Sequence, residues 1–342
     1  MKIWALDDGI PGHWSMTEGL IRLIGRVRPV EVERIVVEWR WGAARQIFQR
    51  CERLGLPVPA WCVRWATRFS LPAGGSPDLL VSRGGATLFL NAWLARRLGC
   101  ANVFVGTLRK LPPRLFRAVI LRQDERVDGP YFPLPLFPTR MDPSSFDQAL
   151  GEFAWTAGAP TGPVAALLIG GDGSGYVYTD DDWRALAEGM AAWHREQGVR
   201  WCVTTSRRTP PEVEQSIIET VPAGAIHEAC WWHRGDRRAC MTAFVAAGRQ
   251  VFCTEDSMSM LEEVIAGGRG LVALSPARAE ANGFFRDFLA QREAAGRMVR
   301  LPLREFAGGG GGFPVENPRG WRLVEAGEME AGVARLLEFL GL

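Results

Sequence analysis

An acidic, hydroxyl-rich turn at residues 254–259 (Thr-Glu-Asp-Ser-Met-Ser) has the residue types needed to bind a phosphorylated ligand. It follows a short apolar run and precedes a helix-like run, the position at which open α/β sheets bind ligands. Free N–H groups at a helix N-terminus favour an anion there. Ser257 and Ser259 allow close approach, and Glu262 or Glu263 can accept hydrogen bonds from sugar hydroxyls. The alternative is ordinary helix capping, because Ser259-x-x-Glu262 matches a capping box.

Two further turns in the second half of the chain also follow apolar runs. Residues 170–175 (Gly-Gly-Asp-Gly-Ser-Gly) offer backbone amides for a diphosphate, and Arg207 and Arg208 could fork onto phosphate oxygens. Residues 209–212 (Thr-Pro-Pro-Glu) match a second capping box, with proline at the first helical position. In a parallel sheet the three turns are expected to converge at one edge, with a merely solvated loop edge as the alternative. The candidate nucleotide-binding residues are Gly170, Gly171, Asp172, Gly173, Ser206, Arg207, Arg208, Glu255, Asp256, Ser257, Ser259 and Glu263.

The first half of the chain holds the candidate catalytic residues. The turn Asp8-Gly-Ile-Pro-Gly-His13 directly follows the first apolar run, and His13 stands where the next helix-like run starts. A neutral imidazole suits a general base, which makes His13 and Asp8 candidates for deprotonating an acceptor hydroxyl. The alternative is a histidine that caps its own loop. Asp124, which follows the apolar run 118–121, is either a third catalytic carboxylate or a turn residue.

These turns are positioned by short apolar runs that alternate with helix-like runs. Strands are predicted at 2–6, 30–37, 78–81, 102–105, 118–121, 164–169, 200–204, 251–253 and 271–274. Helices are predicted at 14–24, 86–98, 181–197, 237–247, 284–294 and 325–340. Strands that alternate with helices indicate parallel sheets with right-handed crossovers.

A proline-rich stretch at residues 128–143 divides the chain, because no regular element tolerates that proline density. We expect an N-terminal Rossmann-like acceptor domain at 1–145 and a C-terminal Rossmann-like nucleotide-binding domain at 146–320. A closing helix within 321–342 is expected to pack back on the N-terminal domain. The fold class is then α/β, with two Rossmann-like, doubly wound parallel-sheet domains facing a cleft, and such a cleft is the default ligand site.

Composition sets the class of protein. Hydrophobic residues make up 47% and charged residues 23% of the 342 residues, as in globular proteins. A net charge of +2 argues against a nucleic-acid partner. The seven cysteines are odd in number and scattered, which indicates a reducing cytoplasm. The N-terminus turns acidic by residue 7, unlike a signal peptide, and no apolar run approaches the ~20 residues of a membrane span. We expect a cytoplasmic protein, with contact at the inner face of the membrane left open.

Three other segments have competing interpretations. His227, Cys230, His233 and Cys240 do not match zinc-site spacing, and the neighbouring Trp231 and Trp232 suggest a buried strand instead. The aromatic and basic run 61–69 could lie on a bilayer surface or cover the domain core as a surface helix. The five glycines at 308–312 are expected to form a mobile surface loop.

Taken together, the motifs resemble those of the mitochondrial fission factor family, the plant "elongated mitochondria" proteins and their bacterial relatives. The matching segments are Asp8-Gly-x-Pro-Gly-His13, residues 168–172 (Leu-Ile-Gly-Gly-Asp), residues 205–210 (Thr-Ser-Arg-Arg-Thr-Pro) and residues 254–260 with Glu263. They are spread over residues 1 to 275. The family looks like glycosyltransferases of the two-Rossmann (GT-B) type, similar to the lipid-linked sugar transferases of peptidoglycan and lipid A synthesis.

The resemblance implies a role for each half of the chain. A serine- and glutamate-containing loop of the C-terminal domain would hold the donor nucleotide, with Glu263 at the position of the glutamate that binds ribose. The N-terminal glycine loop and His13 would face the acceptor, which could be a small molecule or lipid-linked. The expected activity is metal-independent, inverting transfer from a nucleoside-diphosphate sugar, with no further cofactor.

Two other functions were weighed. An adaptor of the mitochondrial-fission-factor type would keep the fold, lose the chemistry and recruit a membrane-remodelling or assembly protein as its partner. A nucleotide-sugar epimerase is disfavoured, because the first strand lacks G-x-G-x-x-G and lysine at positions 2 and 110 alone allows no Tyr-x-x-x-Lys pair.

Overall fold

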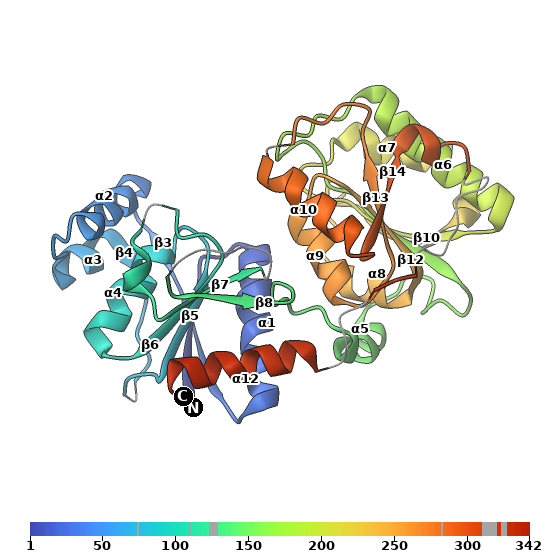
Figure 1. Cartoon of the computed structure of the whole chain (residues 1–342). Coiled ribbons are helices and arrows are strands. Elements are labelled where there is room, and N and C mark those ends of the chain that lie inside the picture. Colours follow the sequence, from blue (N-terminus) through green and yellow to red (C-terminus); the bar gives the residue numbers. More distant parts are fainter. Residues whose placement is uncertain (74, 110, 123–128, 282, 310–319, 323–326) are drawn as a thin grey trace. The chain divides into compact units, whose positions relative to one another are not determined.

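The chain folds into two compact units in a computed structural model that describes residues 1–342 except 74, 110, 123–128, 282, 310–319 and 323–326 (Figure 1). Unit 1 combines Met1–Arg140 with Val324–Leu342, and unit 2 comprises Met141–Leu323. Asp124 and most of the glycine run 308–312 lie outside the described residues.

Unit 1 is built on a six-stranded sheet in which all neighbouring strands are parallel. The order is β2-β1-β5-β6-β7-β8. The strands are β1 (Lys2–Asp7), β2 (Glu31–Val36), β5 (Leu79–Arg83), β6 (Ala101–Val105), β7 (Ala118–Arg122) and β8 (Tyr131–Leu134). Because β2 lies on one side of β1 and β5 on the other, the winding reverses between β1 and β5. Doubly wound sheets bind their ligands at such a switch point.

Helices cover both faces of this sheet, and the alternation along β1 shows how. Ile3 and Ala5 pack in one core cluster with residues of α1 (Pro11–Val27) and α12 (Glu328–Leu340). Trp4 and Leu6 point to the opposite cluster, which includes α4 (Leu88–Leu98). Smaller elements complete the unit: β3 (Glu38–Trp39), α2 (Gly42–Arg53), α3 (Ala60–Ala66), β4 (Thr67–Arg68) and η1 (Pro113–Leu115).

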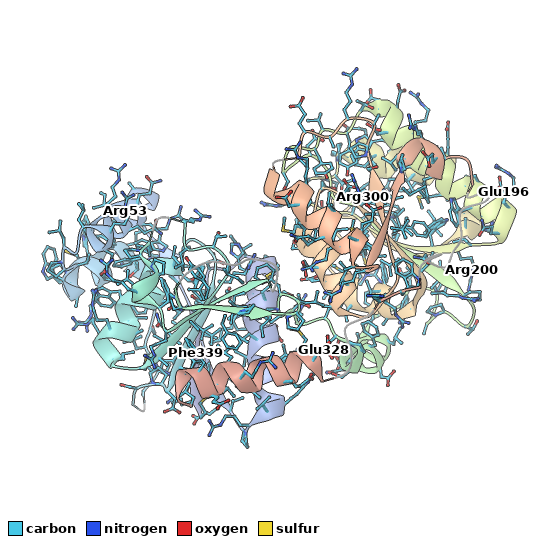
Figure 2. The ribbon with its side chains drawn as sticks, in the orientation of Figure 1. Arg53, Glu196, Arg200, Arg300, Glu328 and Phe339 are labelled. Carbon is cyan, nitrogen blue, oxygen red and sulfur yellow. The ribbon has the colours of Figure 1, made fainter. Side chains whose placement is uncertain are left out.

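Helix α12, from the C-terminal end of the chain, belongs to unit 1. It packs on α1 and β8, where Phe132 and Phe339 place their ring centroids 5.9 Å apart. An ion pair of 3.1 Å joins Arg26 of α1 to Glu330. Figure 2 shows Glu328 and Phe339 near the two ends of the helix.

Unit 2 repeats the arrangement with six parallel strands in the order β11-β10-β9-β12-β13-β14. The strands are β9 (Val164–Leu168), β10 (Arg200–Thr204), β11 (Ile226–Cys230), β12 (Gly248–Thr254), β13 (Leu271–Ser275) and β14 (Met298–Pro302). Here β10 lies on one side of β9 and β12 on the other. The switch point of this sheet therefore lies between β9 and β12.

The helices of unit 2 follow the periodic apolar runs of the sequence. They are η2 (Pro143–Ser145), α5 (Phe146–Glu152), α6 (Asp180–Gln197), α7 (Pro211–Thr220), η3 (Ala223–Ala225), α8 (Met241–Ala247), α9 (Met258–Ala266), α10 (Gly283–Ala294) and α11 (Leu303–Phe306). Reciprocal hydrogen bonds between Thr179 and Asp182 start α6, and Gly198 ends it in the left-handed conformation. Trp193 of this helix stacks on Phe306 and contacts Phe252 in the core.

The structure corrects several local predictions. Neither expected capping box forms, because α7 and α9 begin after Pro210 and Ser257 and neither has a side-chain cap. The helix predicted at 237–247 starts only at Met241. Trp231 and Trp232 lie half-buried in the turn after β11 rather than in a buried strand. Within the described ranges, no helix is long and apolar enough to cross a membrane.

Candidate functional site

The turn after β12 in unit 2 carries two carboxylates that are completely buried. Glu255 accepts hydrogen bonds from Nε and Nη2 of Arg300, at 2.8 and 2.6 Å, and from the Tyr176 hydroxyl at 2.6 Å. Arg300 lies on β14 (Figure 2). The hydrogen bond to Glu255 raises the pKa of Arg300, so the guanidinium stays charged. Glu255 therefore ties β12 to the loop after β9 and to β14.

Asp256 connects the same turn to the neighbouring loops. Its carboxylate lies 2.5 Å from the Arg208 guanidinium and accepts hydrogen bonds from the Gly171 amide at 3.2 Å and the Tyr178 hydroxyl at 3.1 Å. Burial raises the pKa of Asp256, and the positive charge of Arg208 opposes that shift. Arg208 also donates to the carbonyls of Gly171 and Asp172. One buried carboxylate thus fixes both the glycine loop and the arginine.

The glycine loop is shaped by these contacts, and most of its amides are used inside the protein. The Gly170 and Gly171 amides donate to Thr254 and Asp256, and the Gly173 amide donates to the carbonyl of Tyr176. The expectation that the amides at 170, 171 and 173 are available to a diphosphate is therefore wrong for this conformation. Glycine is required at 170 because a Cβ would lie 2.2 Å from the Asp256 carboxylate.

Other groups at this edge remain available to a ligand. Arg207 is exposed and has no ion pair or hydrogen bond among the described residues. The N-terminus of α9 carries no side-chain cap, so its first N–H groups are open to an anion. Ser257 and Ser259 lie at this N-terminus, with their hydroxyls 3.5 Å apart. Glu263 lies one turn further along and already has an interaction within the protein, and Glu262 is buried against Arg292 at 2.9 Å.

Two further candidates of this loop region have mainly local contacts. Asp172 is exposed and accepts a hydrogen bond from the Tyr178 amide at 2.9 Å, which closes the loop on itself. Ser206 donates from its hydroxyl to the Gly170 carbonyl at 3.1 Å and receives the Arg208 amide at 3.1 Å. Both residues therefore shape the edge that Arg207 occupies.

In unit 1, Asp8 and His13 come together at the switch point between β1 and β5. Nδ1 of His13 lies 2.9 and 3.1 Å from the two oxygens of Asp8, whose side chain is only 2% exposed. An ionised carboxylate can only accept, so the proton of a neutral imidazole lies on Nδ1 and Nε2 keeps its lone pair. Nε2 has no partner in the described part of the chain. The pair has the geometry of a general base held by a carboxylate.

Glycine at position 84 makes room for this pair. Gly84 follows β5 at φ +100°, and a Cβ there would lie 2.4 Å from both Asp8 and Nδ1 of His13. The adjacent Asp7 belongs to a different contact, with the Arg34 guanidinium 2.5 Å away. Asp124, the third catalytic candidate, is outside the described residues.

Sequence reasoning missed the side chains that hold the nucleotide-site candidates in place. Tyr176, Tyr178 and Arg300 fix the two buried carboxylates. The tyrosines follow the glycine loop directly, which was a usable signal. Arg300 lies 45 residues from Glu255 in sequence, and nothing local connects them.

Two doubly wound parallel sheets, each with polar turns at its switch point, define a protein of the GT-B class. Its sequence matches the family described as Mitochondrial fission ELM1 over residues 11–322. The chain therefore belongs to the Mitochondrial fission ELM1 family, which the sequence motifs had indicated.

Similar solved structures share the fold at low sequence identity. The UDP-GlcNAc 2-epimerase of Methanocaldococcus jannaschii has a TM-score of 0.58 and 13% identity, over 99% of this chain and 100% of that one. The same enzyme in complex with UDP-GlcNAc and UDP has a TM-score of 0.53 and 12% identity, over 99% of this chain and 100% of that one. A UDP-glucosyltransferase from Polygonum tinctorium has a TM-score of 0.51 and 11% identity, over 100% of this chain and 98% of that one. No curated protein matches the sequence.

Proposed function

We propose that this protein is a glycosyltransferase that moves a sugar from a nucleoside-diphosphate donor to a hydroxyl group of an acceptor. The observation that carries the proposal is the Asp8–His13 pair at the switch point of unit 1, with Nε2 unpartnered among the described residues. The uncapped α9 N-terminus and the exposed Arg207 at the switch point of unit 2 support it. The histidine pair suits a general base, and the α9 N-terminus with Arg207 suits a diphosphate.

In the proposed reaction, Nε2 of His13 removes the proton of the acceptor hydroxyl. The acceptor oxygen attacks the anomeric carbon while the bond from that carbon to the diphosphate oxygen breaks, so the anomeric configuration inverts. Asp8 acts as a positioning residue that keeps the imidazole proton on Nδ1. No metal ion takes part in the reaction as we propose it.

The leaving diphosphate acquires negative charge as the bond breaks. Arg207, Arg208 and the amides at the start of α9, beginning at Ser257, would stabilise that charge, which is usually a large part of catalysis. Glu263 would accept hydrogen bonds from the ribose hydroxyls. Asp256 would act indirectly, by holding Arg208 at 2.5 Å.

Calorimetric titration of the full chain with UDP, GDP, ADP and TDP tests donor binding. We expect one of them to bind, and we expect Arg207→Ala to lower kcat by about 10²–10³-fold. Arg195→Ala is the matched control, because Arg195 is an exposed arginine on α6, away from the switch point. Failure of all four nucleotides to bind would overturn the proposal. Analysis of products from UDP-GlcNAc separates transfer from epimerisation, and 2-epimer formation without transfer would also overturn it.

A second candidate function, a membrane-attached adaptor, is favoured by exposed tryptophans in unit 1. Trp61 and Trp65, one turn apart on α3, are 72% and 63% exposed. Trp41 is also exposed and lies 4.1 Å from Trp65, centroid to centroid. We call Trp41, Trp61 and Trp65 the tryptophan patch. Exposed arginines at 40, 64 and 68 surround it in sequence, a combination that fits an anionic bilayer surface.

A further inference from the structure

A third turn reaches the carboxyl edge of the unit 1 sheet beside the histidine pair. It follows β6, the neighbour of β5, and ends at Arg109. A Cβ added to Gly85 would lie 2.8 Å from Cζ of Arg109 and 3.0 Å from each terminal nitrogen. The guanidinium plane therefore rests against the Gly85 backbone. A Cβ added to Gly84, the preceding residue, would likewise lie 2.4 Å from an oxygen of Asp8 and from Nδ1 of His13.

Arg109 and the Asp8–His13 pair are therefore neighbours. Consecutive Cα atoms are about 3.8 Å apart, so the two groups approach backbone positions that are one residue apart. At each position the glycine leaves the space that the neighbouring side chain occupies. A ligand with a hydroxyl at Nε2 of His13 could place a second group on Arg109.

No residue that the structure describes compensates the charge of Arg109. Its side chain is exposed and has no ion pair or hydrogen bond among the described residues. The two acids at the carboxyl end of β1 pair with other residues, Asp8 with His13 and Asp7 with Arg34. A second guanidinium, that of Arg83, lies at the same edge, with its Nη1 3.2 Å from the Val105 carbonyl.

The backbone of Arg109 is in an uncommon conformation. Arg109 has φ +55°, a left-handed conformation that a non-glycine residue adopts only at an energetic cost. Ser174, in the glycine loop of unit 2, is the only other non-glycine residue with positive φ among those described. Ser174 follows β9, and Arg109 follows β6, so each unit has one such residue in a turn after a sheet strand.

We propose that Arg109 forms an anion subsite for a phosphate or diphosphate group of the acceptor. A guanidinium presents two parallel N–H donors, which match phosphate oxygens. The subsite deepens the proposed function and rests on it for the identity of the ligand as acceptor. The acceptor is then a phosphorylated molecule whose hydroxyl reaches His13, either a soluble phosphate ester or a lipid-linked phosphate.

The test is a pyrophosphate titration of the full chain, followed by the imidazole NMR signals of its four histidines. His13→Gln identifies the His13 signal. We expect pyrophosphate to shift this signal and Arg109→Gln to weaken the apparent affinity at least tenfold. Arg109→Lys, which keeps the charge, should recover part of that loss. Arg114→Gln is the control, because Leu115 beside it contacts Asn102, close to the opposite end of β6.

A His13 signal that does not respond to pyrophosphate, or that responds equally in Arg109→Gln, overturns the subsite. Thermal melting of each variant separates lost binding from lost folding. Arg207→Ala distinguishes this proposal from the transferase proposal, since it should leave the His13 response unchanged while weakening nucleotide binding. A pyrophosphate response at His13 without any nucleotide binding would support the subsite and count against the transferase.

A second arm of the test separates the two sources of the phosphate. Geranyl pyrophosphate adds an apolar chain to the same anion. A tenfold tighter response at His13 with geranyl pyrophosphate than with pyrophosphate supports a lipid-linked acceptor, and equal affinities support a soluble one. In both cases Arg109→Gln must weaken the response for the subsite to stand.

Discussion

At the scale of single residues, the most consequential contact is the buried pair of Asp256 and Arg208. The carboxylate is fully buried, so its charge depends on the guanidinium 2.5 Å away and on the Gly171 amide. The aspartate and the arginine were both predicted as ligand-binding residues from sequence. The structure shows that the aspartate is occupied by protein groups, so its contribution to binding would pass through Arg208.

Arg208→Gln is expected to lower the free energy of unfolding by about 3–5 kcal/mol, because it leaves a buried carboxylate without its cation. Asp256→Asn in the same background should recover part of that loss. Urea unfolding of the two single variants and the double variant measures the coupling. Arg207→Gln, at the exposed neighbour, is the control and should change stability by no more than about 0.5 kcal/mol.

The raised pKa of Asp256 gives a pH dependence of a defined sign. The folded state holds the proton more tightly than the unfolded chain, whose aspartate titrates near 3.8. The stabilisation from this group is therefore complete below pH 3.8 and is lost as the pH rises through the raised folded value. Relative to Asp256→Asn, the wild type should lose stability over that interval. A difference between the two proteins that stays constant with pH would contradict this assignment.

The histidine pair makes a separate prediction about catalysis. Asp8→Asn replaces an acceptor at Nδ1 by a side chain whose amide can donate, which allows the imidazole proton to move to Nε2. We expect kcat to fall by about 10²–10⁴-fold with little change in KM. The His13→Gln substitution should lower kcat by at least as much. If Asp8→Asn retains full kcat, Asp8 has no positioning role.

At the scale of elements, the tryptophan patch depends on the short helix α3. Val63 and Ala66 on one side of α3 are completely buried, so Trp61 and Trp65 must lie on its exposed side. The prediction that the run 61–69 covers the core is confirmed for one face of α3, and bilayer contact by the open face stays a prediction.

Trp61→Ala and Trp65→Ala are each expected to weaken binding to vesicles that contain phosphatidylserine by at least about tenfold, because each removes an exposed aromatic side chain that the bilayer would bury. Sedimentation with vesicles measures the bound fraction, with pure phosphatidylcholine as the uncharged comparison. Phe339→Ala is the matched control, since Phe339 is half exposed on α12 but outside the patch. Equal binding of all three variants would show that the patch does not contact lipid.

At the scale of the whole molecule, the two units have separate cores, and the C-terminal helix completes the first one. Leu336 of α12 is fully buried in a cluster with residues of β1, α1 and β5. The last residues of the chain are thus needed for a unit that starts at residue 1.

Leu336→Ala should cost unit 1 about 2–5 kcal/mol of stability, from lost burial and a residual cavity. Unit 2 has no part in that cluster and should be unaffected. Hydrogen exchange followed by mass spectrometry reports the two units separately, and faster exchange is expected in β1 and β5 but not in β9 and β12. Equal acceleration in both units would mean that they unfold together.

The periodic patterns of the sequence predicted the α/β class and the strands at the centre of each sheet, but missed the edge strands β8, β11 and β14 and the helix α2. The expectation that 128–143 holds no regular element was wrong, because β8 pairs with β7 within it. Val164–Leu168 is a continuous apolar run and the centre of Arg200–Thr204 (Trp-Cys-Val) is another, as expected of strands buried on both faces. Glycines end α4 and α6. The motifs also indicated the family, because their residues are close together in sequence. These features depend on local preferences and on the pattern of hydrophobic burial.

What the sequence left open are the contacts between residues far apart in the chain. The capping boxes were wrong because Glu262 pairs with Arg292, and Thr209 binds the carbonyls at 169 and 170. The amides of Gly170 and Gly171 donate to Thr254 and Asp256, and the order of β1, β5 and β6 places Arg109 and His13 at the same edge of the sheet. Hydrogen bonds and ion pairs are satisfied by whichever partner the folded chain brings within about 3 Å, and local sequence does not encode that choice.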